Sequence, residues 1–530
     1  MNMFTRPVIA AITSVVAVAT LTACTGGGGG AGGATGGVVE GATFTLSMAN
    51  DPGALDPQAS TASNMLQLAA FAYDRLIGLD NDGDLVPWLA EDWAIEGATV
   101  TLTLKDGITC SDGSEFTAET AAENLNWVAD PANLSPFFGV LIPPSTSTAD
   151  ADTLTIHLDK PAPFVLQSLA MLPMVCAAGL EDRSLLTAAT AGSGPYVLTE
   201  AAPNDHYTFQ LNPDYAWGPS GATTKGRGMP ATIVARVIPN ETTSANLVLS
   251  GEVNAAQVIG PDAKRLEGAG LFSVGVDTLT GEQWYNQKSG HATSDPAVRM
   301  ALTQALDLAE LQKIVTSGEG TPATALAVTS PAGCGYNSVS GNVPETDVAA
   351  AENALDDAGW VRGSDGIREK DGQRLSLSFL YMNILGTGGT SAAELAVQAW
   401  KKIGVEVTAT SNDATTLMGA FTGTGDWDIA WLSLNVWNPD QLVPFFSGPV
   451  SPDGNNWSSI HNADYESGVA EAMTMTGADG CDTWKDAEAA LFRAADLVPF
   501  ANTEAKTFGN GAKFAIVGWI VATSIQMLAK

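Results

Sequence analysis

The sequence predicts an α/β protein with two or more domains. The prediction rests on the chain length and on the alternation of two hydrophobic periods. The chain has 530 residues, of which about 490 follow a glycine-rich segment near the N-terminus. This length is too great for one ordinary hydrophobic core. Segments with a period of two alternate with segments of helical period, without an internal repeat, and this pattern is typical of an α/β architecture.

Four segments have the composition or the period of strands. Residues 42–49 (ATFTLSMA), 98–109 (ATVTLTLKDGIT) and 152–160 (DTLTIHLDK) alternate apolar and polar side chains, which predicts half-buried strands. Residues 514–522 (FAIVGWIVA) are strongly apolar. This segment is too short to span a bilayer, so we expect a buried strand there.

Helical spacing of apolar residues predicts four helices, over residues 117–128, 295–315, 346–359 and 390–404. Thr117 is expected to cap the first of these helices, with Glu119 and Glu123 in its first turns. Gly359 and Gly404 are expected to end the last two helices, because glycine adopts the left-handed conformation that terminates a helix.

The first 41 residues have the features of an export and anchoring segment. Arg6 precedes an apolar run over residues 8–23, which is the layout of a secretory signal and is shorter than a membrane span. The residues Leu21-Thr22-Ala23-Cys24 resemble the lipobox of bacterial lipoproteins, in which the cysteine receives diacylglycerol. We therefore expect a signal peptide over 1–23, lipidation of Cys24, and a flexible tether over 24–41. An ordinary signal peptide followed by a stray thiol is the alternative.

The chain is strongly acidic. It has 24 Lys and Arg against 58 Asp and Glu, a net charge of −34, which becomes −35 without residues 1–23 because they contain one Arg and no acid. This charge argues against nucleic-acid binding, which uses clustered Lys and Arg. It also argues against electrostatic adhesion to anionic lipid, in agreement with attachment through acyl chains.

Four cysteines follow Cys24, at positions 110, 176, 334 and 481. An even number in an exported protein predicts two disulfides. Three pairings are possible. We favour Cys110–Cys176 and Cys334–Cys481, because each pair stays within one half of the chain. Four buried free thiols are the alternative.

The sequence has no recognisable catalytic motif. It has no H-E-x-x-H, C-x-x-C, G-x-S-x-G or phosphate-loop motif. Its four histidines, His157, His206, His291 and His461, are scattered singly. A carboxylate pair of the kind that glycosidases use is defined in space, and no acidic residue stands out in the sequence. We therefore predict no enzyme, no cofactor and no metal site.

Ten phrases, in order, resemble the bacterial extracellular solute-binding proteins of family 5, the dipeptide, oligopeptide and nickel receptors of ABC importers. Each phrase alone is weak, and the ten in order are strong, since the matches run from about residue 42 to 500, nearly the whole mature chain. They are LDPQAS (55–60), YDRL (73–76), PWLAEDW (87–93), LTLKDGITCSDGSEFTAETAAENLNWV (102–128), GSGPYVLTE (192–200), NPDYAWG (212–218), SANLVLSGEVNAA (244–256), DPAVRMALTQALDL (295–308), ALDDAGW (354–360) and GDWDIAWLSLNVWNPDQL (425–442).

The resemblance implies a two-lobed fold like that of periplasmic binding proteins of type II, cluster C, with an extra domain inserted in the first lobe. Lobe one would contain residues 42–56, 188–283 and 498–530. The extra domain would be residues 57–187, and lobe two residues 284–497. Ligand would be held between the two hinged lobes.

The function that the resemblance implies is capture of a solute for an ABC permease and its ATPase. The protein would be a monomer, anchored by lipid to the outer face of the cytoplasmic membrane or present in the periplasm. Oligopeptides or peptide-like solutes are the expected ligands. The alternatives are a neutral oligosaccharide on the same fold, a secreted hydrolase, and a sensor lipoprotein that does not serve import.

Seven residues are candidates for the ligand site, and core packing is the alternative for each tryptophan because Trp is mostly buried in folded proteins. The candidates are Trp431, Asn435, Trp437, Asp440 and Trp457 in the second lobe, with Tyr73 and Trp284 from the opposite side.

The candidate loop departs from the family at one position. Peptide receptors of this family carry an aspartate there that binds the α-ammonium of the peptide, and with Pro439 as reference Asn435 takes its place. An amide cannot neutralise a buried ammonium. Asp440 is close enough in sequence to substitute, or it serves the turn. The sequence therefore favours modified peptides or neutral solutes alongside ordinary peptides, and disfavours nickel because no histidines cluster.

Overall fold

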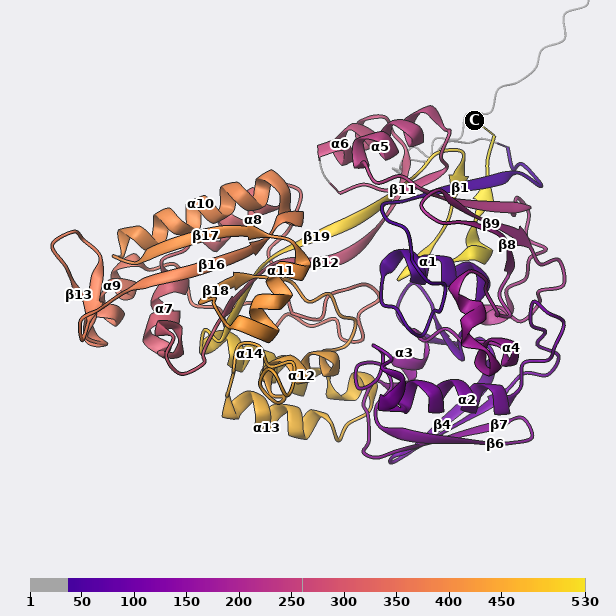
Figure 1. Cartoon of the computed structure of the whole chain (residues 1–530), viewed down its shortest axis with the longest axis horizontal. Coiled ribbons are helices and arrows are strands. Elements are labelled where there is room, and N and C mark those ends of the chain that lie inside the picture. Colours follow the sequence, from indigo (N-terminus) through magenta and orange to yellow (C-terminus); the bar gives the residue numbers. More distant parts are fainter. Residues whose placement is uncertain (1–36, 260, 530) are drawn as a thin grey trace, which may run out of the picture.

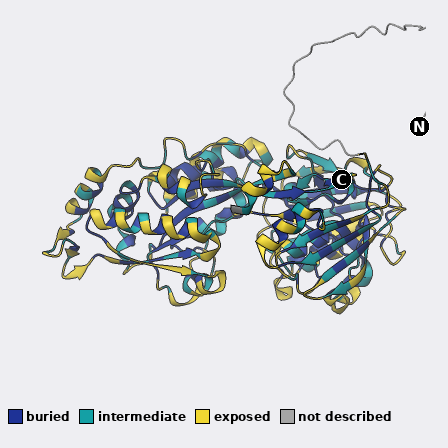
Figure 2. Cartoon of the chain, turned by 90° about the horizontal axis from the view of Figure 1, so that it is seen from above, coloured by how far each residue is buried: buried dark blue, intermediate teal, exposed yellow. Residues whose placement is uncertain are grey.

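The computed structural model describes residues 37–259 and 261–529. The predicted signal peptide, Cys24 and most of the predicted tether lie outside these ranges. The described chain forms two bodies (Figure 1). We call the body with α1–α6 the first body and the body with α7–α14 the second body. Seen from above, the two bodies lie side by side, and buried residues fill the interior of each (Figure 2).

A ten-stranded mixed sheet extends through both bodies. In spatial order its strands are β17 (Glu406–Asn412), β16 (Ser376–Met382), β18 (Ile429–Trp431), β12 (Phe272–Tyr285), β19 (Leu497–Gly509), β11 (Ala255–Gln257), β1 (Thr43–Met48), β10 (Thr232–Val237), β9 (His206–Leu211) and β8 (Tyr196–Ala202). The chain connects the two bodies through β12 and β19 (Figure 1).

β12 and β19 pair antiparallel from Phe272 opposite Gly509 to Trp284 opposite Leu497, with register shifts around Gly281. A Cβ atom at Gly281 would lie 2.4 Å from the Phe500 ring. Glycine is therefore required at this irregularity, because a larger residue would collide with the ring across the strand pair.

A second sheet lies in the first body, where α2 packs against it (Figure 1). It is antiparallel and has the order β4 (Ala90–Glu96), β5 (Thr99–Leu104), β7 (Thr153–Leu158) and β6 (Ser145–Asp150). The predicted strands over 42–49, 98–109 and 152–160 correspond to β1, β5 and β7. The apolar side chains of β5 and β7, including Val100, Leu102 and Leu154, are buried in the core of this body, as their period of two predicts.

Four small sheets complete the strands: β2 (Ile77–Leu79) with β3 (Leu85–Pro87); β13 (Val361–Arg362), β14 (Arg368–Lys370) and β15 (Gln373–Arg374); β20 (Ala512–Lys513) with β23 (Gln526–Met527); and β21 (Ile516–Val517) with β22 (Trp519–Ile520). The single buried strand expected over 514–522 is therefore wrong. Gly518, at a φ of +70°, reverses the chain into a two-stranded hairpin, and Trp519 is only half-buried.

The helices cover the sheets and fill the ends of the two bodies. They are α1 (Ser63–Ala72), α2 (Ala118–Ala129), α3 (Val165–Leu169), α4 (Ala177–Glu181), α5 (Glu241–Ser250), α6 (Pro261–Gly268), α7 (Pro296–Gln304), α8 (Leu308–Val315), α9 (Val348–Asp357), α10 (Gly386–Lys402), α11 (Ala414–Gly419), α12 (Val443–Phe446), α13 (Ala463–Ala472) and α14 (Cys481–Arg493).

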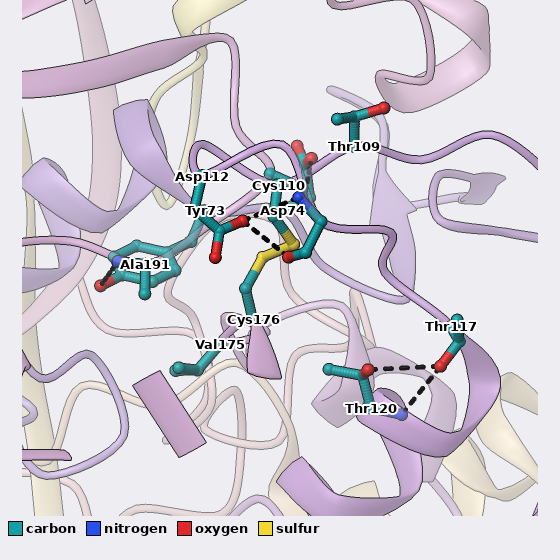
Figure 3. Close-up of a disulfide and its surroundings, with 12 residues drawn as sticks. Tyr73, Asp74, Thr109, Cys110, Asp112, Thr117, Thr120, Val175, Cys176 and Ala191 are labelled. Carbon is teal, nitrogen blue, oxygen red and sulfur yellow. Dashed lines mark hydrogen bonds between the residues drawn. A yellow bond between two sulfur atoms is a disulfide. The ribbon is translucent and has the colours of Figure 1, made fainter. Parts of the chain in front are cut away.

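Three of the four predicted helices are single helices. Thr117 caps α2 as predicted, because its Oγ1 accepts the backbone N–H of Thr120 at 3.3 Å (Figure 3). Gly359 and Gly404 follow α9 and α10 at φ values of +87° and +86°. The helix predicted over 295–315 divides into α7 and α8, because Asp307 adopts an extended conformation and caps a new helix.

Both favoured disulfides are present. Cys110 is bonded to Cys176 in the first body, and Cys334 to Cys481 in the second. Figure 3 shows the first of these beside Tyr73 and Asp74. Each bond joins segments that are distant in the chain, 66 and 147 residues apart, so each restricts the unfolded chain strongly.

Candidate functional site

The loop over residues 432–441 leaves β18 and runs along the face of the second body that meets the first. Three hydrogen bonds that involve side chains fix it to β12. The Trp284 Nε1–H donates to the Leu432 carbonyl at 2.8 Å. The Leu434 N–H donates to Glu282 Oε2 at 3.1 Å, and the Leu279 N–H donates to Asn435 Oδ1 at 2.9 Å. The loop is therefore fixed to one of the two strands that connect the bodies.

The end of the loop is held by its own side chains. The Gln441 Oε1 accepts the backbone N–H groups of Trp437 and Asn438, at 3.0 and 3.2 Å. Pro439 begins a 3₁₀ turn, where its missing N–H is no loss. These contacts fix the backbone of Trp437 before any ligand binds.

Three polar atoms at this end of the loop are buried without a hydrogen-bond partner among the described residues. They are Trp437 Nε1, Asn438 Oδ1 and Asp440 Oδ1. Burial raises the pKa of Asp440 to about 7, because the charged form loses hydration. Buried polar groups are normally hydrogen-bonded, so a donor and a carboxyl group are available here for a ligand.

The predicted residues Asn435, Trp437 and Asp440 are thus brought together on one loop, with Asn435 exposed. Trp457 and Trp284 lie together elsewhere, in an aromatic cluster. Their ring centroids are 6.0 Å apart, and Trp284 is fully buried. Trp284 packs in the core of the second body, while Trp457 lies at its edge and is half-buried.

Trp431 and Tyr73 lie in two other cores. Trp431 is 1% exposed and packs at 4.9 Å on Phe379, measured between ring centroids. Its Nε1–H donates to Gln283 Oε1. Tyr73 is fully buried in the first body, and its hydroxyl accepts the Ala191 N–H. Neither side chain presents a surface to a ligand in this conformation.

A buried carboxyl group lies behind the loop. Glu282, on β12, is 1% exposed, and its Oε1 has no hydrogen-bond partner within the described part of the chain. Burial, together with the negative charge of Glu488, raises the pKa of Glu282 to about 8. Glu282 is therefore protonated at neutral pH, at the point where the loop is attached to the connecting strand.

The first body meets this face in several places. The Trp519 ring, in the C-terminal hairpin, lies 6.0 Å from the Trp437 ring. Phe164, which precedes α3, packs in the same hydrophobic cluster as Trp284. The Gly477 N–H donates to the Pro163 carbonyl at 2.9 Å. The two bodies therefore touch at the level of the candidate loop.

A pocket opens beside Trp519 on the first body. Arg75 and Trp88 line it together with apolar residues of α1, of the segment that follows α3 and of the C-terminal hairpin. The volume inside it that water-sized molecules can occupy is about 50 Å³. No sequence motif marks these residues as a site. The available signal in the sequence was Arg75, which follows Asp74 inside the otherwise largely apolar run from Phe71 to Leu79.

Among the residues that the structure describes, no three His, Cys, Asp or Glu side chains are grouped so that they could hold a metal ion. No helix in residues 37–259 or 261–529 has both the length and the apolar character of a membrane span.

Comparison with known proteins gives relatives along most of the chain. Protein XP55 of Streptomyces lividans is 29% identical over 389 residues, which are 70% of this chain and 67% of the relative. The nickel-binding periplasmic protein of Escherichia coli (strain K12) is 27% identical over 373 residues, 67% of this chain and 68% of the relative.

A solved structure has the same fold. It is a substrate binding protein from Microbacterium hydrocarbonoxydans complexed with 4-hydroxybenzoate hydrazide, and it matches with a TM-score of 0.70 at 25% identity, covering 92% of this chain and 100% of that one. The family model of the bacterial extracellular solute-binding proteins, family 5 Middle, matches residues 84–456. This chain therefore belongs to that family, the two-lobed solute receptors of ABC importers.

Proposed function

We propose that this protein is a lipid-anchored extracytoplasmic receptor that captures an oligopeptide or peptide-like solute between its two bodies and delivers it to an ABC permease. The proposal rests on the contact between Trp437 of the second body and Trp519 of the first body. Among the described strands of the ten-stranded sheet, only β12 and β19 connect the two bodies. A ligand that inserts beside these rings would favour one relative position of the bodies.

The proposed domains follow the predicted division. Lobe one would contain residues 42–56, 188–283 and 498–530, the extra domain residues 57–187, and lobe two residues 284–497. Two observations support it. The proposed boundaries at 283/284 and 497/498 lie within β12 and β19, the two strands that run between the bodies (Figure 1). The four-stranded sheet lies wholly within residues 57–187.

The proposed anchor is Cys24, after removal of residues 1–23. The lipobox-like residues Leu21–Cys24 support it, together with the glycine-rich segment that follows. The protein would then work as a monomer at the outer face of the cytoplasmic membrane or in the periplasm. It would bind its solute without turning it over.

We propose that the site has no strong requirement for a free ammonium group on its ligand. Asn435 takes the place of the aspartate that this loop carries in peptide receptors, and its Oδ1 already accepts the Leu279 N–H. Asp440 has a pKa of about 7 and carries only part of a negative charge at neutral pH. A neutral oligosaccharide is the alternative ligand class, because Trp437 and Trp519 offer flat apolar faces.

The experiment is a thermal-shift and calorimetry screen of residues 25–530 against free peptides, N-acetylated peptides, oligosaccharides and nickel chelates. We expect stabilisation by peptide-like solutes, with weaker binding in Trp437→Ala. Asn435→Asp should strengthen the binding of free-amino peptides. Tight binding of free-amino peptides that survives Asp440→Ala and does not improve with Asn435→Asp would overturn the account of the loop.

Two further measurements separate the rival classes. Chemical turnover of any bound compound, followed by mass spectrometry, would indicate a hydrolase. Uptake of a bound solute that continues in cells without this gene would argue against an import role and favour a sensor.

A further inference from the structure

Arg75 differs from the other buried arginines that the structure describes. Arg299 is bonded to the Asp496 carboxylate and to three backbone carbonyls. Arg368 is bonded to the Asp356 carboxylate and likewise to three backbone carbonyls. Arg75 is likewise buried, at 5% exposed, but its Nη2 has no hydrogen-bond partner in the described residues. A guanidinium has five N–H donors, and leaving them unpaired in the interior is unfavourable.

The adjacent carboxylate does not satisfy Arg75. Asp74 accepts four hydrogen bonds, each from an uncharged donor, at 2.7 to 2.9 Å. The donors are Trp88 Nε1–H, Ser193 Oγ–H, Tyr215 O–H and Trp217 Nε1–H. A carboxylate has about four lone-pair sites, so these donors occupy its capacity. Asp74 therefore compensates the charge of Arg75 through space and leaves its Nη2 without a partner.

Two indole rings hold the guanidinium in place. The Arg75 Cζ lies 5.5 Å from the centroid of the Trp88 ring and 5.2 Å from that of the Trp519 ring. Cation–π contacts of this kind use the faces of the rings and leave the N–H edge of the guanidinium available. The group is thus positioned before binding, which lowers the entropy that a ligand contact would lose.

The surroundings indicate what kind of group could use this edge. Besides Arg75, the pocket is lined by the two indoles, by Tyr215 and by Thr523. The rest of the lining consists of aliphatic, methionine and proline side chains, among them Leu79, Met171 and Val517. A carboxylate matches the planar fork of a guanidinium with two parallel hydrogen bonds. The apolar lining matches an aromatic or aliphatic body attached to that carboxylate.

We propose that Arg75 and its pocket bind the carboxylate of an organic acid with an apolar body, N-acylated peptides being the peptide-like members of this class. The inference rests on the proposed receptor function and narrows its ligand class. The first body supplies a cation for the acid, and the loop of the second body has Asn435 where an ammonium-binding aspartate would stand. The pocket adjoins the second body through the Trp519–Trp437 contact.

The test compares a carboxylate with its amide on the unaltered protein. N-acetyl-L-phenylalanine and N-acetyl-L-phenylalaninamide differ only in that group, and benzoate with benzamide forms a second pair without a peptide bond. Calorimetry with residues 25–530 should give at least about tenfold tighter binding for one carboxylate than for its amide. The pair that shows the preference distinguishes an acylated peptide from a simple aromatic acid.

Variants then assign the preference to one residue. Arg75→Met should weaken carboxylate binding by about 30-fold or more and leave amide binding unchanged, because a desolvated ion pair is lost. Arg75→Lys keeps the charge, loses the fork and should lie between. Arg227→Met is the matched control, since Arg227 is exposed and the same net charge is removed. Circular dichroism establishes which variants are folded.

Three results would overturn the proposal: equal binding of carboxylate and amide by the unaltered protein, no binding of any of the acids, or an unchanged carboxylate preference in folded Arg75→Met. These results leave the receptor function standing if other members of the solute screen bind and require Trp437. If no solute of any class binds, the proposed function fails with it.

Discussion

Trp437 and Trp519 lie with their ring centroids 6.0 Å apart, although 81 positions separate them in the chain and they belong to different bodies. Trp437 also packs against the core that the four-stranded sheet and α2 form in the first body. The contact therefore links the candidate loop directly to the opposite body. Its removal is expected to change the relative position of the bodies, which can be measured.

Trp437→Ala should loosen the two bodies in the absence of ligand. The substitution removes the indole that reaches across, while the loop backbone stays fixed by Gln441. Small-angle scattering should show a larger radius of gyration, with about 1 kcal/mol or less of lost stability because the ring is only half-buried. Trp93→Ala, on β4, is the control and should leave the radius unchanged. A large loss of stability in Trp437→Ala would instead assign the ring to core packing.

Each disulfide should contribute about 2–4 kcal/mol to the free energy of unfolding. We expect reductant to lower the melting temperature, and the paired Cys→Ser variants at 110/176 and at 334/481 to lower it separately. In the chain-entropy account the second pair has the larger effect, because it closes the longer segment. A non-reducing peptide map should give the same two pairs, and labelling of all four positions as free thiols would contradict it.

The stability should decrease as pH rises from about 4.5 to about 8. Burial raises the pKa of Glu282 from 4.5 to about 8, so the folded state holds a proton that the unfolded state releases, and folding weakens with pH in this window. Asp74 and Asp440, whose pKa values burial raises to about 6 and about 7, act in the same direction.

Glu282→Gln should reduce this pH dependence, because an amide has no proton to lose and can still accept the Leu434 N–H. The free energy of unfolding in urea should be measured at pH 5 and pH 8. Relative to the unaltered protein, that of the variant should increase from pH 5 to pH 8 by on the order of 1–3 kcal/mol. Glu91→Gln, an exposed substitution on β4, should leave the slope unchanged. Parallel pH curves for Glu282→Gln and the unaltered protein would refute the assignment.

Cys24→Ser should release the protein from the membrane. Without the thiol no diacylglycerol can be attached, and a strongly acidic chain has no electrostatic affinity for anionic lipid. Fractionation with an antibody should find the variant in the soluble fraction or the medium. Membrane association that is unchanged by the substitution would exclude this anchor.

The local elements followed from the sequence because their causes are local. The period of two over residues 98–109 and 152–160 is enough to bury one face of β5 and β7, and Thr117 caps α2 with its own side chain. The helix over 295–315 was predicted too long, because the apolar period continues through a position where Asp307 prefers to cap a new helix.

The candidate site was predicted only in part, and the reason lies in burial. Tryptophan has the same hydrophobic surface whether it lies in a core or on a binding face. Its sequence context therefore did not separate Trp431, which packs on Phe379, from Trp437, which reaches the other body. Trp519 was assigned to a buried strand, and the reversal at Gly518 places it on the pocket instead.

By itself, the sequence determined the α/β class, the family and the disulfide count. It also determined the ends of α9 and α10 at Gly359 and Gly404, because periodicity, glycine and capping residues act over a few neighbouring positions. Only the tertiary structure decided which polar groups are buried and which remain without partners. The four donors on Asp74 come from residues 88, 193, 215 and 217. The hydrogen-bond capacity of a buried charge is allocated by such distant segments when the chain folds, so no local pattern marks Arg75 as the guanidinium that is left free.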